Sequence, residues 1–295
     1  MECIVSTNKL YKKYKKHIAI SGVEMHISKG SIYGLIGKNG AGKSTLLKII
    51  AGLSMPSSGS VSSIPKDKMG VLIESPALYQ NLTAYENLKL KCIALGIKDY
   101  GCINETLKIV GLYQDNKKVK NYSLGMKQRL GIGLALIGNP QLLILDEPIN
   151  GLDPQGILEI RNVIIKLNGE KNITIIISSH ILEELSKLAT DFGFINQGML
   201  LRELSQKELD EKCGERLEIV VDNINKAKET LKRLEIRDYE VNENQGSIYI
   251  YERIEESAEI GTELVKSAVK IKAMTCVKQS LEEFYFDLME ETEYA

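Results

Sequence analysis

GKNGAGKS, residues 37–44, fits the pattern GxxxxGK[ST]. It joins the apolar run SIYGLIG, residues 31–37, to the helical pattern KSTLLKIIAGL, residues 43–53. A strand, a glycine-rich loop and a helix in this order bring backbone N–H groups and the positive end of a helix dipole to one point. The segment therefore predicts a phosphate-binding loop.

The residues of this loop have separate expected roles. The glycines let the backbone approach phosphate oxygens, Lys43 reaches the β- and γ-phosphates, and Ser44 can ligate Mg²⁺. The residues expected to bind ATP here are Gly37, Lys38, Asn39, Gly40, Ala41, Gly42, Lys43, Ser44 and Thr45. A glycine-rich turn without a ligand is the alternative, which the strand–loop–helix context disfavours.

A second candidate site is LLILDEP, residues 142–148, an apolar run that ends in two adjacent carboxylates. A buried, isolated charge is costly, so these acids need a cation or a reacting water beside them. We expect Asp146 to hold Mg²⁺ through water and Glu147 to act as the general base on the water that attacks the γ-phosphate. Taken alone, the motif could also be a strand end followed by a capped helix.

The segment YSLGMKQRLGIGLALIG, residues 122–138, places Ser123 and Gly125 at the start of an amphipathic helical pattern. A serine and a glycine at a helix N-terminus are typical of an anion site. A purely structural helix cap explains Ser123 equally well at this point.

Apolar runs alternate with helical patterns through the first two hundred residues. QLLILD is followed by PQGILEIRNVIIKL, and ITIIISS by HILEELSKL. This alternation indicates buried strands covered by helices, an α/β fold. Residues 85–112 are instead helical throughout, with a break at Gly101. We expect one domain over residues 1–205, with a helical subdomain at about residues 78–138.

The remaining residues predict a second, smaller domain over residues 215–295. Its strands and helices follow a βαββαβ order, which is that of a ferredoxin-like α+β domain, and a final helix starts at Ser280. Leu281, Phe284, Tyr285 and Leu288 form one face of that helix, which must pack on something. Dimer contact or regulation, a ligand sensor, and an inert cover for the core are the open roles for this domain.

Composition narrows the class of protein. The 38 basic and 39 acidic residues nearly balance, but residues 203–295 carry 23 acids and 13 bases, so the front part is net basic. Because these bases are spread along the chain, no nucleic-acid partner is expected. No apolar run approaches the roughly 18 residues of a membrane span, and no export signal is expected, because the first residues, MECIVSTNKLYKK, lack an apolar stretch after a basic start. The five scattered cysteines are expected to be reduced thiols.

The chain resembles ATP-binding-cassette ATPases over residues 1 to about 205. The resemblance depends on four motifs and their order: GKNGAGKS, SLGMKQR, LLILDEPINGLDP and SSH, residues 178–180. The resemblance implies a P-loop NTPase cassette, with ATP and Mg²⁺ as ligands. It implies a head-to-tail dimer of nucleotide-binding subunits, in which Ser123 and Gly125 face the γ-phosphate on the other subunit. A monomeric P-loop kinase or GTPase would leave SLGMKQR without a role.

Three further roles follow only from this resemblance. Tyr14 corresponds to the aromatic residue that stacks on adenine. Residues 150–153, which include Asp153, correspond to the loop that couples the two sites. His180 corresponds to the γ-phosphate switch. A lone histidine that caps a helix is the alternative interpretation of His180.

Two positions depart from the family pattern. The first lies in SLGMKQR, the segment that resembles the signature motif of the family. Leu124 and Met126 stand there where the motif usually has glycine and glutamine, and such replacements are common in the family. Glu74 stands where most members have a glutamine that approaches Mg²⁺ and signals to the membrane subunit. Glu74 is therefore a candidate metal ligand, unless it simply faces water.

A narrower resemblance involves LIESPALYQNLTAYENL, residues 72–88, with EPINGLDP and the extra domain, which are similar to the subgroup that exports bacitracin or lantibiotics. It implies an amphipathic antimicrobial peptide as substrate, separate polytopic membrane subunits, and a place at the cytoplasmic face of the cell membrane. A cassette ATPase that acts on DNA or ribosomes is disfavoured by the single P-loop. A regulatory module with a vestigial ATPase is disfavoured by the intact Lys43, Asp146, Glu147 and His180.

Overall fold

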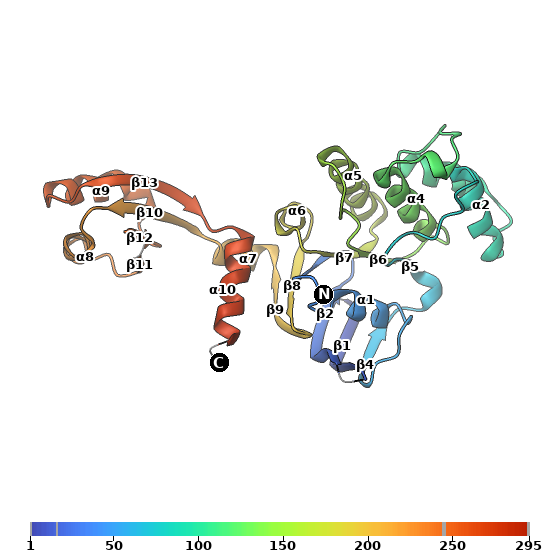
Figure 1. Cartoon of the computed structure of the whole chain (residues 1–295), viewed down its shortest axis with the longest axis horizontal. Coiled ribbons are helices and arrows are strands. Elements are labelled where there is room, and N and C mark those ends of the chain that lie inside the picture. Colours follow the sequence, from blue (N-terminus) through green and yellow to red (C-terminus); the bar gives the residue numbers. More distant parts are fainter. Residues whose placement is uncertain (1, 16, 244–245, 294–295) are drawn as a thin grey trace. The chain divides into compact units, whose positions relative to one another are not determined.

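The computed structural model describes residues 2–15, 17–243 and 246–293. Lys16, and residues 244–245 and 294–295 of the predicted second domain, lie outside the described residues. The chain forms two compact units (Figure 1). The N-terminal unit comprises residues 1–206 with 291–295, and the C-terminal unit residues 207–290.

The N-terminal unit is built around a six-stranded sheet of order β5-β6-β7-β3-β8-β9. All neighbours pair in parallel except β9, which is antiparallel to β8. The strands are β3 (Ile32–Ile36), β5 (Met69–Leu72), β6 (Leu142–Asp146), β7 (Thr174–Ser179), β8 (Asp191–Asn196) and β9 (Met199–Ser205). Every residue of β3, β6 and β7 is buried, which explains why these strands appear in the sequence as unbroken apolar runs.

A second sheet of order β2-β1-β4 is antiparallel throughout and consists of β1 (Cys3–Tyr14), β2 (His17–Ser28) and β4 (Ser58–Ser63). Its apolar residues share one core with helix α1 (Lys43–Ile50) and the main sheet. Leu10 and Ile20 come from the second sheet, Leu46 from α1 and Ile144 from β6. The phosphate loop therefore starts and ends in rigid, buried elements.

Helices α2 (Ala84–Ala94), α3 (Gly101–Ile109) and α4 (Leu124–Leu136) form the predicted helical segment. Thr83 and Glu86 start α2 as a reciprocal capping box. The break in the helical pattern lies at residues 95–100, and Gly101 is the first residue of α3. Short 3₁₀ helices cover Lys66–Lys68 (η1) and Val119–Asn121 (η2), while α5 (Pro154–Lys171) and α6 (Leu182–Ser186) follow β6 and β7.

The C-terminal unit contains a four-stranded antiparallel sheet of order β11-β12-β10-β13. Its elements follow the order β10 (Glu215–Val221), α8 (Ile224–Arg233), β11 (Tyr239–Asn242), β12 (Ser247–Ile250), η3 (Ile254–Glu256), α9 (Ser257–Lys266) and β13 (Ile271–Lys278). One sheet face packs against α8 and α9 through residues such as Ile219, Leu231 and Leu264. Helices α7 (Gln206–Lys212) and α10 (Leu281–Glu293) lie before and after this order.

The final helix agrees with its sequence pattern. Ser280 caps the start of α10, because its hydroxyl accepts from the Glu283 N–H and Glu283 accepts from the Ser280 N–H. The predicted apolar face is buried, with Leu281, Phe284, Tyr285 and Leu288 each less than one-tenth exposed.

The topology gathers three of the sequence motifs at one edge of the main sheet. Strands β6, β7 and β3 are neighbours and run in parallel, so their carboxyl ends meet. Those ends are followed by Glu147, His180 and the phosphate loop. In open parallel sheets the carboxyl edge is where ligands bind.

Candidate active site

The phosphate loop has a backbone that only glycine allows at two of its positions. Gly40 and Gly42 have positive φ angles of 85° and 109°. A Cβ atom at Gly42 would lie 2.7 Å from the Ala19 carbonyl oxygen. The loop therefore exposes main chain rather than side chains just before α1, whose first N–H groups are free of intrahelical partners by construction. This geometry suits an anion.

Lys43 is the first residue of α1, and its side chain is only 5% exposed. Its Nζ donates to the carbonyl oxygens of Gly37 (2.6 Å) and Lys38 (3.2 Å). The same ammonium forms an ion pair with Glu147 Oε1 at 3.1 Å. Lys43 thus lies folded back across its own loop and is held by oxygen atoms, the kind of partner that phosphate also provides.

Glu147 connects this lysine to the next motif. Its Oε2 lies 2.8 Å from His180 Nδ1, while Oε1 contacts Lys43. The Glu147 side chain is 19% exposed, and its backbone has a left-handed φ of 48°, which is uncommon for a residue other than glycine. The structure therefore brings together Lys43, Glu147 and His180, three residues that lie far apart in the sequence.

Asp146, which is 4% exposed, occupies the end of β6 beside this cluster. Its Oδ1 accepts a hydrogen bond from Ser178 Oγ at 2.7 Å. The Ser178 hydroxyl also accepts from the Glu147 N–H at 2.9 Å. Sequence reasoning considered only His180 of the SSH motif and missed Ser178. The sequence carried no signal for it, because the pairing of β7 with β6 is set by the tertiary fold.

The donors near the loop are of the kind that Mg²⁺ prefers. Ser44 lies in the first turn of α1, and Asp146 ends a neighbouring buried strand. Within the described residues, no cluster of three or more His, Cys, Asp or Glu side chains forms a metal cage. A hydroxyl and a carboxylate fit Mg²⁺, which commonly takes its remaining ligands from phosphate and water.

Glu74 has a different neighbour from the one expected of a metal ligand. Its Oε1 accepts from Lys48 Nζ of α1 at 2.6 Å. This hydrogen bond lowers the pKa of the Glu74 carboxyl and raises the pKa of Lys48. The Glu74 side chain is 68% exposed. In this structure it is thus paired with a surface ammonium.

Tyr14 ends β1 and is 45% exposed, so its ring face is accessible. The ammonium of Lys12 lies 4.8 Å from the centre of that ring and donates to the Met55 carbonyl at 2.6 Å. A planar base could stack on such a ring. The contact with Lys12 was not anticipated from the sequence.

Ser123 and Asp153 are both helix caps. The Ser123 hydroxyl accepts from the Met126 N–H at 3.2 Å at the start of α4, and Asp153 Oδ1 accepts from the Gly156 N–H at 3.0 Å at the start of α5. The two helix starts are neighbours, because a Cβ on Gly125 would lie 3.7 Å from Gly156 Cα. The signature segment and the 150–153 loop therefore form a second group of predicted site residues.

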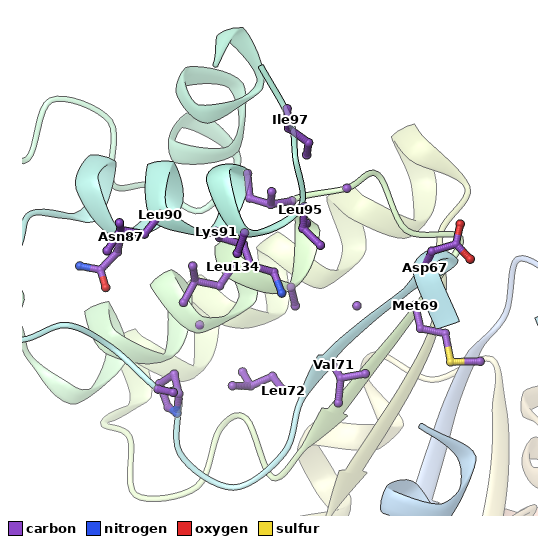
Figure 2. Close-up of a pocket in the computed structure, with 18 of the residues that line it drawn as sticks. Asp67, Met69, Val71, Leu72, Asn87, Leu90, Lys91, Leu95, Ile97 and Leu134 are labelled. Carbon is purple, nitrogen blue, oxygen red and sulfur yellow. The ribbon is translucent and has the colours of Figure 1, made fainter. Parts of the chain in front are cut away.

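A pocket of about 740 Å³ lies between η1 and β5 on one side and α2 and α4 on the other (Figure 2). Its lining is mainly apolar and includes Met69, Val71, Leu72, Leu90, Leu95, Ile97 and Leu134. Leu90 and Leu95 are 38% and 49% exposed, which is high for leucine in a folded domain. Three lysines and one aspartate add charge: Lys66, Lys68, Lys91 and Asp67.

Comparison with known proteins agrees with this geometry. Residues 20–150 match the family model described as ABC transporter. The chain is 41% identical to the uncharacterized ABC transporter ATP-binding protein YcbN of Bacillus subtilis, over 98% of both chains. The chain belongs to the ABC transporter ATP-binding proteins. This ABC subunit is also 38% identical to the bacitracin transport ATP-binding protein BcrA of Bacillus licheniformis, over 98% of both chains.

Other relatives of the ABC subunit cover about two thirds of its chain. The lantibiotic transport ATP-binding protein SrtF of Streptococcus pyogenes is 48% identical over 68% of this chain and 89% of its own. A dimeric ATP-binding cassette, solved in a post-hydrolysis state with ADP and Pi, matches 69% of this chain and 99% of its own, with 27% identity and a TM-score of 0.62. The ABC subunit is accordingly an ATPase that binds ATP. Over the described residues, none of its helices combines the length and the apolar character that crossing a bilayer requires.

Proposed function

We propose that this ABC subunit hydrolyses ATP to drive export of an antimicrobial peptide through separate membrane subunits. The proposal on ATP chemistry depends above all on one observation, the contact of Glu147 with both Lys43 and His180. The proposal on the substrate is supported by the relatives named for bacitracin and lantibiotic transport, at 38% and 48% identity.

In the proposed mechanism, the γ-phosphate of ATP replaces Glu147 as the partner of Lys43. Glu147 is then free to polarise the attacking water, and His180 contacts the γ-phosphate that lies next to Glu147. Ser44 and Asp146 would hold Mg²⁺, which supplies charge neutralisation on the phosphate oxygens. Glu74 would join them only after leaving Lys48. The other proposed nucleotide ligands are the loop residues 37–45 and Tyr14, which stacks on adenine.

We further propose that two subunits form a head-to-tail dimer. Ser123 and Gly125 of one subunit would then face the γ-phosphate bound to the other, and Asp153 would link the two sites. The dimeric cassette with ADP and Pi supports the formation of a dimer. At the start of α4, a γ-phosphate would meet the N–H groups of a helix N-terminus, which favours negative charge.

The apolar pocket of Figure 2 is the proposed docking place for the membrane subunit. Its exposed leucines require an apolar occupant, and three lysines against one aspartate favour acidic residues beside the apolar ones. We therefore expect a short amphipathic, acidic segment of the membrane subunit to bind here, at the cytoplasmic face of the cell membrane.

We infer a ferredoxin-like domain for the C-terminal part, predicted over residues 215–295, because its element order is βαββαβ and its strand order is β11-β12-β10-β13. The proposed ATPase domain covers residues 1–205 and its helical subdomain about residues 78–138. Dimer contact or regulation is the role we favour for the C-terminal domain. The match to BcrA over 98% of both chains includes this C-terminal part and supports treating it as a regular part of the subunit.

Affinity purification of the tagged chain from detergent-solubilised native membranes tests the proposed partner. We expect one polytopic membrane protein to co-purify, and to be lost with Leu95→Asp but not with Leu158→Asp, an exposed leucine outside the pocket. Peptide resistance of cells should fall in parallel. Recovery of ribosomal or DNA-bound partners alone would contradict a transport role.

A further inference from the structure

Ser178 is a fully buried hydroxyl between the two acidic positions. It lies on β7 and is paired with Asp146 of β6 in the parallel ladder. Its Oγ lies 2.7 Å from Asp146 Oδ1 and 2.9 Å from the Glu147 main-chain nitrogen. One hydroxyl thus contacts the side chain of the first acid and the main chain of the second.

The directions of these two hydrogen bonds are fixed by chemistry. A hydroxyl has a single proton, and the Glu147 N–H can only donate. Ser178 must therefore accept from Glu147 and direct its own proton to Asp146 Oδ1. This bond fixes the rotation of the Asp146 carboxylate and engages one of its two oxygens, so that the other oxygen remains the natural ligand for a cation or its water.

The hydrogen bond to Glu147 acts on a strained backbone. Glu147 has a φ of 48°, and such a conformation persists in a non-glycine residue only where its surroundings hold it. Its N–H lies near both the hydroxyl and the carbonyl oxygen of Ser178, at 2.9 and 3.2 Å. The turn made here directs the Glu147 carboxylate toward Lys43 and His180.

We propose that Ser178 is a positioning residue for ATP hydrolysis, which aligns Asp146 for Mg²⁺ and Glu147 for the attacking water. The inference rests on the roles proposed above for these two acids. Ser178 acts through them, by its hydrogen bonds to Asp146 and Glu147.

Ser179 provides a matched control. It is also fully buried on β7, but its hydroxyl accepts from the Ile181 N–H at 2.9 Å, at the start of α6. Consecutive side chains of a strand point to opposite faces, so the two serines differ in partner rather than in burial or chemistry. An effect of losing any buried hydroxyl would appear in both variants.

The experiment compares Ser178→Ala, Ser178→Thr and Ser179→Ala in the full chain. We expect Ser178→Ala to lower kcat for Mg²⁺-ATP by about 10- to 100-fold, as for other groups that orient metal ligands, with little change in KM because the phosphate loop is intact. Ser178→Thr keeps the hydroxyl and should restore most of the activity, and Ser179→Ala should change kcat little.

Hydrogen exchange in the nucleotide-free chain gives a readout independent of activity. The Glu147 amide should exchange faster in Ser178→Ala than in the unchanged chain, and at the normal rate in Ser178→Thr and Ser179→Ala. Normal kcat with normal exchange in Ser178→Ala would overturn the proposal, as would equal losses in the two alanine variants. If Ser178→Ala does not fold, Ser178→Thr decides: near-normal kcat and exchange support the proposal, and a large loss overturns it.

Glu147→Gln, measured alongside, separates this inference from the function on which it rests. Near-normal turnover of Glu147→Gln would remove Glu147 as the base. The exchange rate of the Glu147 amide still reports whether Ser178 holds that backbone.

Discussion

Both units carry exposed ion pairs, such as Lys48–Glu74 in the N-terminal unit, but the units differ in how deeply some of their pairs are buried. In the N-terminal unit, Lys43 and Glu147 form an ion pair with side chains only 5% and 19% exposed. In the C-terminal unit, pairs such as Lys266–Glu263 and Lys278–Asp210 join side chains that are at least one-third exposed. Exposed pairs contribute little and are readily replaced by water. A buried charge is stable only beside a charged or hydrogen-bonding partner. A buried ion pair therefore indicates a place where a bound ligand replaces one member of the pair.

The largest effect should come from Glu147→Gln. The amide keeps the size of the side chain but cannot accept the proton of water, so hydrolysis should fall by about 10² to 10⁴-fold. ATP binding should remain, because the phosphate loop is unchanged. Steady-state ATPase assays and size-exclusion chromatography with ATP measure this, and we expect the variant to accumulate as an ATP-bound dimer. Turnover close to that of the unchanged chain would refute the assignment of the base.

A pair of core substitutions compares the two units directly. Ile176 on β7 and Ile219 on β10 are both essentially fully buried, each within the core of its own unit. Truncation to alanine should cost each unit about 2–5 kcal/mol, because a cavity is left. Thermal inactivation of the ATPase should occur at lower temperature in Ile176→Ala only. Equal inactivation by Ile219→Ala would mean that the units do not unfold independently.

Lys43→Ala removes the ammonium that faces the phosphates, while Glu147 keeps its contact with His180. A hydrogen bond to a charged group contributes about 1.5–3 kcal/mol, so ATP affinity should fall by roughly 10- to 100-fold. Titration with a fluorescent ATP analogue measures the change. The matched control is Lys166→Ala, a lysine of α5 that is 47% exposed and lies outside the phosphate loop. Equal losses in both variants would indicate general electrostatic attraction rather than a specific ligand.

Glu74→Gln should have the smallest effect on basal ATPase, within a few fold, because the Glu74 carboxylate pairs with Lys48 at the surface. A larger change is expected in peptide resistance if Glu74 signals to the membrane subunit. Equal, small effects on both would support a side chain that only faces solvent.

The same pair has a defined pH dependence. The pKa of Glu74 lies below its usual 4.5, so the small stabilisation by the ion pair is present above that value. It is lost as the pH falls through the lowered pKa. Thermal unfolding of the unchanged chain and of Glu74→Gln should therefore converge in acid. A difference that grows in acid would contradict this pairing.

The sequence by itself determined the local features of this protein. GKNGAGKS predicted a phosphate loop because glycine conformations and a helix start are set within a few residues, and Gly42 indeed has a φ that only glycine adopts readily. The unbroken apolar runs predicted β3, β6 and β7 because strands buried on both faces need no alternation. The order of elements after residue 215 could also be read locally, since turn residues separate them.

Only the tertiary structure decided which side chains meet. Lys43 and Glu147 lie about a hundred positions apart, and their contact depends on β6, β7 and β3 being neighbours, an order that no local pattern encodes. The same order places Ser178 beside Asp146, and the approach of α1 gives Glu74 its partner Lys48. Periodicity states which face a residue occupies, whereas its partners depend on strand order and packing, which are set by the whole core at once.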